Sequence, residues 1–179
     1  MPTLQGLPPI ARTDACVLIL GSMPGAASLL AGQYYAHRQN RFWPYMASLI
    51  DADITLPYPQ RVHRLQGAGI AVWDVIAYCQ REGSLDSAIR DEAVNDFAQF
   101  LDRHANIATV LFNGAKAETT FVRRVLPTLR APGLACRRLP STSPANASQS
   151  DASKLATWRD ALLASGARLL EGGPGQRQP

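Results

Sequence analysis

The sequence has no long hydrophobic segment, although 46% of its 179 residues are hydrophobic. A membrane-spanning helix needs about 20 consecutive apolar residues, and no run approaches that length, so we expect no membrane partner. The N-terminal stretch MPTLQGLPPIART also lacks the sustained apolar core of a secretory signal. We therefore predict a cytoplasmic protein with a single domain over residues 1–179. Polar, glycine- and proline-rich composition predicts flexible ends at about 1–12 and 171–179.

Cysteine and histidine are scarce, with three residues of each. The cysteines, Cys16, Cys79 and Cys136, are too few and too far apart for a disulfide framework or a four-cysteine metal site. We expect reduced, packed thiols. The histidines are scattered and show no metal-ligand spacing, so we predict no metal.

Nucleotide-cofactor motifs are absent as well. Neither GxxxxGK[ST] nor GxGxxG with a later acidic residue occurs, so ATP or dinucleotide binding is not supported and we predict no cofactor. Only two lysines are present, Lys116 and Lys154, and both fall in predicted helices, so no Schiff-base nucleophile is expected. The net charge of +4 and the pI near 9.3 slightly favour a polyanionic partner.

Four short apolar runs are separated by stretches long enough for crossover helices, which is typical of a mainly parallel sheet. The runs are Cys16–Leu20, Gly69–Trp73, Ala108–Phe112 and Leu134–Leu139. The stretches between them show helical periodicity or a helix-stopping residue. These predicted helices cover 42–50, 58–66, 94–101, 115–126 and a stretch that begins near 151. The pattern predicts an α/β fold with helices on both faces of the sheet.

The carboxyl ends of parallel strands open into loops at one edge of the sheet, where open α/β proteins bind ligands. All four expected loops carry polar or aromatic residues. The first is GSMPGAASLLAGQYYAHRQNRFW, Gly21–Trp43; Asp74 follows the second strand, Asn113 the third, and STSPANAS, 141–148, the fourth. One pocket with walls from all four loops would suit a flat polar ligand.

The first loop is shaped by Gly21, Pro24, Gly25 and Gly32, which let the backbone approach a ligand while its amides stay free. A tight turn without a ligand explains the same residues.

Four polar or aromatic side chains follow in this loop. Tyr34 and Tyr35 are adjacent, so we expect one to be packed and one to be free to stack on a planar base, and position alone does not decide which. Asn40 precedes a predicted helix and is either its N-cap or a group that orients a water or a base edge. His37 is either a structural hydrogen-bonding residue or a polar group of the pocket.

The last loop is rich in hydroxyls and leads into the helix that begins near Asp151. Its amides and hydroxyls suit phosphates at a helix N-terminus, whereas a capping loop with Ser150 or Asp151 as the cap explains the same composition. Asp74 also has two interpretations: it orients a water, or it accepts hydrogen bonds from the first loop.

The segments GSMPG and GQYYAHRQNRFW resemble the first motif region of the uracil-DNA glycosylase superfamily, and most of all its hypoxanthine-DNA glycosylase branch. The resemblance continues in GIAVWDVIAYCQREGSLDSAI (69–89), LFNGAKA (111–117) and LPSTSPANAS (139–148), and it covers most of residues 16–160. It implies a three-layer α/β/α sandwich around a four-stranded, mainly parallel sheet. It also implies that the partner is DNA containing deaminated bases, on which we expect the protein to act as a monomer.

One departure from the wider family pattern concerns Met23. Mismatch-specific uracil glycosylases share G-I-N-P-G followed by F-A-H-P-x-N-R-F-W, and the asparagine of the first motif helps to activate water. A thioether at this position does not orient or polarise a water, so the resemblance to the hypoxanthine branch makes Asn40 the catalytic candidate. Tyr35 aligns with the family's base-stacking aromatic residue.

Two further sets of residues are expected to contact the substrate. The base-binding residues are Gly21, Ser22, Met23, Pro24, Gly25, Tyr35, Asp74 and Asn113. The DNA-binding residues are Ser141, Ser143, Pro144, Ala145, Asn146 and Ser148. The stretch 143–146 would enter or brace the minor groove beside the emptied site.

The expected reaction is hydrolysis of the N-glycosidic bond of a flipped deaminated base, most of all hypoxanthine in deoxyinosine, by a monofunctional glycosylase that uses water. Removal of uracil or xanthine by the same machinery is the first alternative. A damaged-DNA-binding module with weak or lost catalysis is the second, and Met23 favours it. A small α/β enzyme that acts on free nucleosides is the third.

Overall fold

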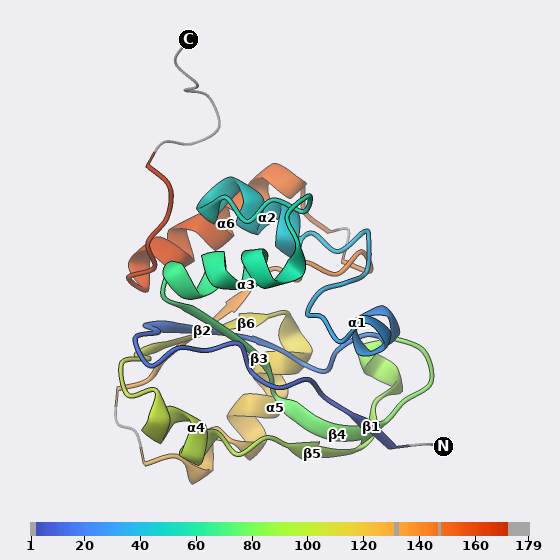
Figure 1. Ribbon diagram of the computed structural model, residues 1–179. Coiled ribbons are helices and arrows are strands. Elements are labelled where there is room, and N and C mark those ends of the chain that lie inside the picture. The colour runs from blue at the N-terminus through green and yellow to red at the C-terminus, as the bar shows by residue number, and fades with distance from the viewer. Residues whose placement is uncertain (1–2, 131–132, 147, 172–179) are drawn as a thin grey trace.

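A four-stranded parallel sheet with the order β3-β2-β6-β7 forms the centre of the computed structural model, which describes residues 3–130, 133–146 and 148–171 (Figure 1). The strands are β2 (Val17–Gly21), β3 (Ile70–Asp74), β6 (Thr109–Asn113) and β7 (Ala135–Leu139). Each one overlaps a predicted apolar run, so the prediction of a parallel sheet is confirmed. The register places Gly21 beside Asp74 and Asn113 beside Leu139, so the carboxyl ends of all four strands lie at one edge.

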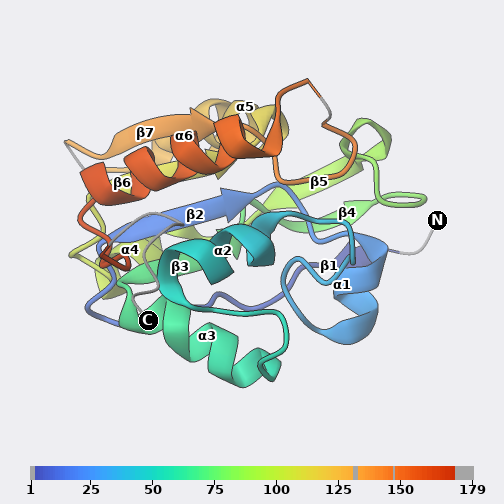
Figure 2. The same cartoon turned by 90° about the horizontal axis from the view of Figure 1, so that it is seen from above.

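Helices cover both faces of this sheet, which confirms the three-layer arrangement (Figures 1 and 2). One face carries α2 (Phe42–Ile50), α3 (Tyr58–Gly67) and α6 (Asp151–Ala164). The other carries α4 (Phe97–Arg103) and α5 (Ala115–Arg124). A short helix that the sequence did not predict, α1 (Ala26–Ala31), lies within the first loop.

The core lies between these layers. All strand residues from Val17 to Leu20 are fully buried, and aromatic side chains pack on both sides of them. Phe42 and Trp158 come from one helical layer, and Phe97 and Phe121 come from the other. Burial of each such side chain contributes about 1.5–3 kcal/mol, so the sheet is a rigid support for the loops at its edge.

A second, antiparallel sheet was not predicted. It consists of β1 (Thr3–Gln5), β4 (Ile76–Gln80) and β5 (Arg90–Val94), in the order β1-β4-β5. The chain passes from β3 into β4 with only Val75 between them. The second sheet therefore starts directly at the edge where the loops of the first sheet emerge.

The prediction of a flexible N-terminal end is wrong for residues 3–12. Thr3–Gln5 pair with β4, and Ile10 exchanges two backbone hydrogen bonds of 2.8 Å with Val72 and is buried. Polar composition was misleading here because backbone pairing, rather than side-chain burial, holds most of this segment. The predicted flexible C-terminal end lies, beyond Glu171, outside the described residues.

Two helix boundaries also differ from the prediction. Val94 ends β5, where it pairs with Ile76, and the helix begins only at Phe97 after the N-cap Asp96, whose carboxylate accepts from Gln99 N at 3.0 Å. The helix predicted over 115–126 ends at Arg124 and continues as a 3-10 turn, Leu126–Thr128, because Pro127 cannot extend the α-helical hydrogen bonding. Among the cysteines, Cys136 on β7 is exposed rather than packed.

Candidate functional site

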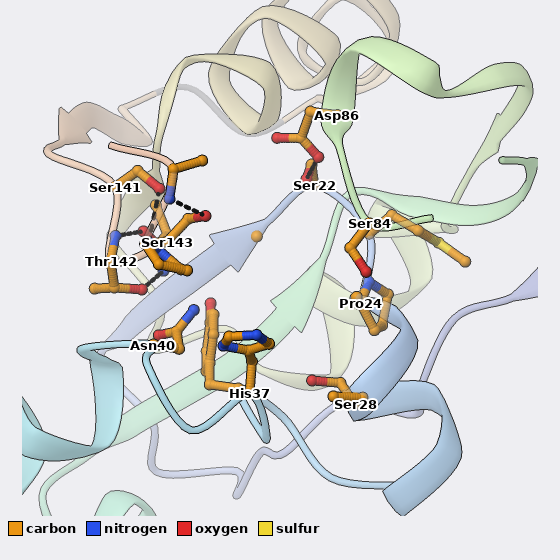
Figure 3. A pocket seen from close by; sticks show the side chains of 18 of the residues that line it. Ser22, Pro24, Ser28, His37, Asn40, Ser84, Asp86, Ser141, Thr142 and Ser143 are labelled. Atoms are coloured by element: carbon orange, nitrogen blue, oxygen red, sulfur yellow. Dashed lines mark hydrogen bonds between the residues drawn. The ribbon is translucent and has the colours of Figure 1, made fainter. Parts of the chain in front are cut away.

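A cavity of about 390 Å³ opens at the carboxyl edge of the parallel sheet, where all four predicted loops meet (Figure 3). We call it the strand-end pocket. The predicted residues around it are Gly21, Ser22, Met23, Pro24, Gly25, Tyr35, Asn40, Asp74, Asn113, Ser141, Ser143, Pro144, Ala145 and Asn146. Ser148 does not line it, and its hydroxyl donates to Asn146 Oδ1 at 2.8 Å instead.

The opening segment of the first loop, Gly21–Gly25, is held by its carbonyl groups. Gly21 O accepts from Val75 N at 2.9 Å, Ser22 O accepts from Ile76 N at 3.0 Å, and Pro24 O accepts from the Arg81 guanidinium. The amides of Ser22, Met23 and Gly25 have no hydrogen-bond partner in the part of the chain that the structure describes. Free amides beside a cavity are donors for a ligand that carries or develops negative charge.

Gly21 is required by the lack of space beside it. A Cβ atom at this position would lie 2.2 Å from Asp74 Oδ1 and 3.4 Å from the Tyr35 hydroxyl oxygen. Asp74 and Tyr35 therefore converge on the floor of the pocket, directly against the end of β2.

The two adjacent tyrosines have different environments, as expected. Tyr34 is buried, and its hydroxyl lies 3.1 and 3.0 Å from the carbonyl oxygens of Leu7 and Pro8. Tyr35 has a left-handed backbone (φ 55°), which is costly for a residue with a Cβ, and its ring stacks on Phe42 at 4.1 Å between centroids. Only the opposite face of the Tyr35 ring is left to receive a planar ligand.

Asn40 lies just outside α2, and it is not the N-cap of that helix, which is Arg41. Its Oδ1 accepts from Phe42 N at 2.9 Å at the start of α2, one residue before the capping position Arg41. This bond assigns oxygen and nitrogen of the amide, because the reverse orientation would face two donors toward each other. Nδ2 is left for the pocket, into which the side chain projects (Figure 3).

His37 also borders the pocket, beside Asn40 (Figure 3). Its Nδ1 accepts from Gln39 N at 3.2 Å, so in the neutral ring the proton is on Nε2. His37 is thus both a structural hydrogen-bonding residue and a polar group of the pocket.

Asp74 is the buried acidic group of the pocket, with a side chain only 3% exposed. Its Oδ2 has no hydrogen-bond partner among the described residues. Burial, together with the nearby charge of Asp86, raises the pKa of Asp74 to about 7, and the Arg81 guanidinium only partly offsets this. Asp74 therefore changes its protonation state near neutral pH.

Asn113 braces the last loop. Its Nδ2 donates to Thr142 Oγ1 at 2.8 Å, and its Oδ1 accepts from Thr142 N at 2.9 Å. A base contact by Asn113, which remains a prediction, would have to use the second N–H or the second lone pair of the amide. Thr142 also ties this loop to the first, because its carbonyl accepts from Arg41 N at 2.9 Å.

Helix α6 supports the same loop from behind. The Lys154 ammonium, buried to 4% exposure, donates to Ser141 O at 3.3 Å and to Asn146 O. Trp158, one turn further, donates from its indole to Pro140 O at 2.9 Å. The helix begins with Ser150 as its N-cap, one of the two predicted caps.

A fifth wall was missed by sequence analysis. Ser84, Leu85 and Asp86, from the loop between β4 and β5, border the pocket across from Asn40 (Figure 3). The turn-forming residues Gly83 and Ser84 signal a loop here, but no pattern in the sequence places that loop beside the ends of the parallel strands. Ala27, Ser28 and Thr142 complete the lining that was not predicted.

The fold and the site together define a class: α/β proteins that hold a flat heterocycle at the carboxyl edge of a parallel sheet and place hydroxyl-rich loops around it. The family model of the uracil DNA glycosylase superfamily matches residues 8–164. The chain belongs to this superfamily.

Relatives and a solved structure agree with this assignment. A protein named hypoxanthine DNA glycosylase from Methanosarcina barkeri is 38% identical over 159 residues, which cover 88% of this chain and 97% of the relative. One of the same name from Methanosarcina acetivorans is 34% identical, over 79% of this chain and 87% of the relative. The solution NMR structure of a candidate uracil DNA glycosylase from Methanosarcina acetivorans superposes with a TM-score of 0.75 at 30% identity, over 92% of this chain and 99% of the other.

Residues 3–130, 133–146 and 148–171 contain neither a candidate membrane span nor a candidate metal cluster. None of the helices there combines the length and the hydropathy that a membrane span requires. No group of three or more His, Cys, Asp or Glu side chains in these residues is arranged to hold a metal ion.

Proposed function

We propose that the chain is a monofunctional DNA glycosylase that removes hypoxanthine from DNA and acts as a monomer in the cytoplasm. The observation that carries this proposal is the strand-end pocket, where the Tyr35 ring, the free amides of the first loop and Asn40 surround one cavity. The names of the two Methanosarcina relatives support hypoxanthine ahead of uracil or xanthine.

Substrate binding requires that the damaged nucleotide leave the duplex. Flipping costs a few kcal/mol and costs least at a weak pair such as one with hypoxanthine. The flipped base stacks on the face of the Tyr35 ring that Phe42 leaves free, and stacking of a base on an aromatic ring contributes about 1–3 kcal/mol. The stacking energy thus offsets much of the cost of flipping.

Asn40 holds the attacking water. Its Nδ2 donates to the water oxygen, while Oδ1 keeps one lone pair beyond the bond from Phe42 N. The water oxygen bonds to C1′ as the bond from C1′ to the base nitrogen breaks. The base leaves with the electron pair and takes up one proton, and the water gives one up. The products are an abasic deoxyribose and the free base.

The departing base gains negative charge, and the first loop faces it with donors. The amides of Ser22, Met23 and Gly25 are unpaired among the described residues, so they stabilise this charge without first breaking other bonds. Both lysines are engaged elsewhere, Lys116 with Glu92 and Lys154 with loop carbonyls. Neither lines the pocket, which supports hydrolysis by water over a Schiff-base mechanism.

A DNA-binding module without catalysis is the second candidate, because Met23 occupies the position of the water-activating asparagine in the related pattern. Oligonucleotides with one hypoxanthine, uracil or xanthine, single- or double-stranded, separate the candidates when abasic sites are scored. Excision of hypoxanthine supports the glycosylase. Binding of the damaged DNA without release of any base supports the module.

Variants of Asn40 and Tyr35 test the assigned roles. Asn40→Ala is expected to lower the excision rate at least about 100-fold, with DNA affinity close to that of the parent. Asn40→Ser is the matched control, since serine keeps a side-chain acceptor for Phe42 N but has no amide nitrogen. If Asn40→Ser excises like the parent, Asn40 serves the helix and not the water. Tyr35→Ala is expected to weaken binding of the flipped base instead.

A further inference from the structure

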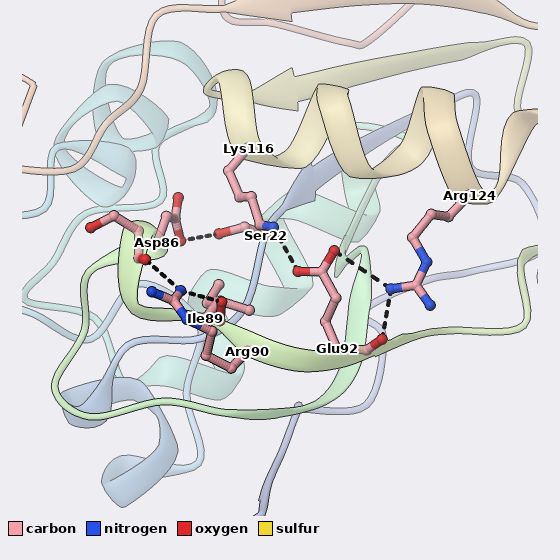
Figure 4. A network of polar contacts seen from close by, with 8 residues as sticks. Ser22, Asp86, Ile89, Arg90, Glu92, Lys116 and Arg124 are labelled. Carbon is pink, nitrogen blue, oxygen red and sulfur yellow. Dashed lines mark hydrogen bonds and ion pairs between the residues drawn. The ribbon is translucent and has the colours of Figure 1, made fainter.

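The loop between β4 and β5, residues 81–89, is attached to the first loop at two points on either side of Leu85. Ser84 Oγ accepts from Ala26 N at 2.9 Å, directly after Gly25. Asp86 Oδ1 accepts from the Ser22 hydroxyl at 2.6 Å (Figures 3 and 4). The residue between these two anchors is therefore fixed relative to the pocket.

Strand β5 of the same hairpin is attached to helix α5. Glu92 on β5 pairs with Lys116 at 2.6 Å and with Arg124 at 3.5 Å, both on α5 (Figure 4). The Arg90 guanidinium stiffens the loop, because its Nη1 donates to Ser87 O at 2.7 Å and to Ile89 O at 2.8 Å. These contacts hold the loop at both its base and its tip.

Leu85 lines the pocket although 61% of it is exposed to solvent. An isolated exposed leucine is common on protein surfaces, but this one borders a cavity and is held there by its two neighbours. The wall that Ser84 and Asp86 form on either side of Leu85 lies across the pocket from Asn40 and Ser141–Ser143 (Figure 3). Most of the apolar surface of Leu85 is therefore available to a molecule that enters the cavity.

We propose that Leu85 is a substrate-contacting residue that packs on the flipped nucleotide from the side opposite Asn40. This inference rests on the proposed function and names a contact of the same site. Leu85 covers the apolar surface of the deoxyribose and the base, and it gains stabilisation only in the bound state. Since it contacts the nucleotide inside the pocket, its effect is the same for single- and double-stranded substrates.

The test compares Leu85→Ala with the matched control Leu30→Ala. Leu30 lies on α1, is 92% exposed and does not line the pocket. Single-turnover excision from deoxyinosine oligonucleotides is measured against protein concentration, in single and double strands. Leu85→Ala is expected to raise the half-saturating concentration about tenfold on both substrates, in line with the loss of one apolar contact. Leu85→Met, which keeps the apolar volume, stays within about threefold of the parent.

Two results overturn the inference. In the first, Leu85→Ala and Leu30→Ala have the same half-saturating concentration. In the second, the half-saturating concentration of Leu85→Ala rises only with duplex DNA, which would place Leu85 on the duplex outside the pocket. If the unmutated protein excises nothing, the proposed function fails, and Leu85 is judged by affinity for a deoxyinosine oligonucleotide. Tighter binding by Leu30→Ala than by Leu85→Ala then supports the contact, whereas equal affinities refute it.

Discussion

Asp74 offers the sharpest test of how the pocket works, because its carboxyl group titrates near neutral pH. Burial raises its pKa from an ordinary value of 3.8 to about 7, with a further contribution from Asp86. The folded state thus holds the Asp74 proton more tightly than the unfolded state does. The resulting stabilisation is complete below about pH 4, declines between about pH 4 and 7, and is absent at higher pH. Its full value is on the order of 4 kcal/mol.

Asp74→Asn removes this titration while keeping the shape of the side chain. The parent is expected to lose stability relative to the variant between pH 5 and 8, by about 2 to 3 kcal/mol. Urea unfolding of both proteins at each pH measures the difference, and the other titrating groups cancel because they are common to both. A difference that does not change with pH would show that Asp74 is ionised throughout and would refute the reasoning.

The same variant reports on catalysis. A protonated Asp74 can donate to the departing base, whereas an ionised Asp74 repels the negative charge that develops there. Single-turnover excision by the parent is therefore expected to fall as the pH rises through about 7. Asparagine donates at every pH, so the Asp74→Asn profile is expected to be flat across this range. A parent rate that rises through pH 7 would instead assign the ionised carboxylate to the active form.

Two other substitutions follow from the loops around the pocket. Met23→Asn restores the residue of the related pattern. It is expected to cost about 2–4 kcal/mol of stability without a gain in excision, because it replaces a buried methionine by an amide without partners. Thermal unfolding measures the stability and the excision assay measures the rate, and faster excision would contradict the prediction. Lys154→Met removes the ammonium group that binds the carbonyls of Ser141 and Asn146. DNA affinity, measured by fluorescence anisotropy, is therefore expected to fall about tenfold, while the excision rate at saturating DNA changes less than about twofold. Unchanged affinity would show that Lys154 does not position the loop.

The parallel sheet and the position of the pocket could be predicted from the sequence because both follow from short-range patterns. Three of the four strands, β2, β3 and β6, are apolar runs that end at a polar residue or a glycine, as in Val17–Gly21 and Ile70–Asp74. Parallel pairing then brings those ends together without any knowledge of side-chain contacts. The same argument correctly brought Asp74 and Asn113 to one cavity with the first loop.

The antiparallel hairpin could not be predicted because its strands lack such patterns. β5 is RDEAV, with its first two residues exposed, and Val94 at its end fits the helical spacing of Phe97 and Leu101 equally well. Backbone pairing with β4 decides in favour of the strand, and pairing between segments is not visible in a single sequence. Because Ser84–Asp86 depend on this hairpin, their place in the pocket was missed as well.

The hairpin also explains how the first loop keeps its shape with a methionine in place of a polar group. Met23 packs with Ile76 and Cys79 of β4 and with Ile89 in a small cluster of its own, separate from the main core. Arg81, at the end of the same strand, is 5% exposed and donates to Pro24 O, the next carbonyl of the loop. Position 23 therefore contributes hydrophobic anchoring, which leaves the loop amides free for the base. In the proposed mechanism the water is held instead by Asn40, which lies at the start of α2 and lines the cavity.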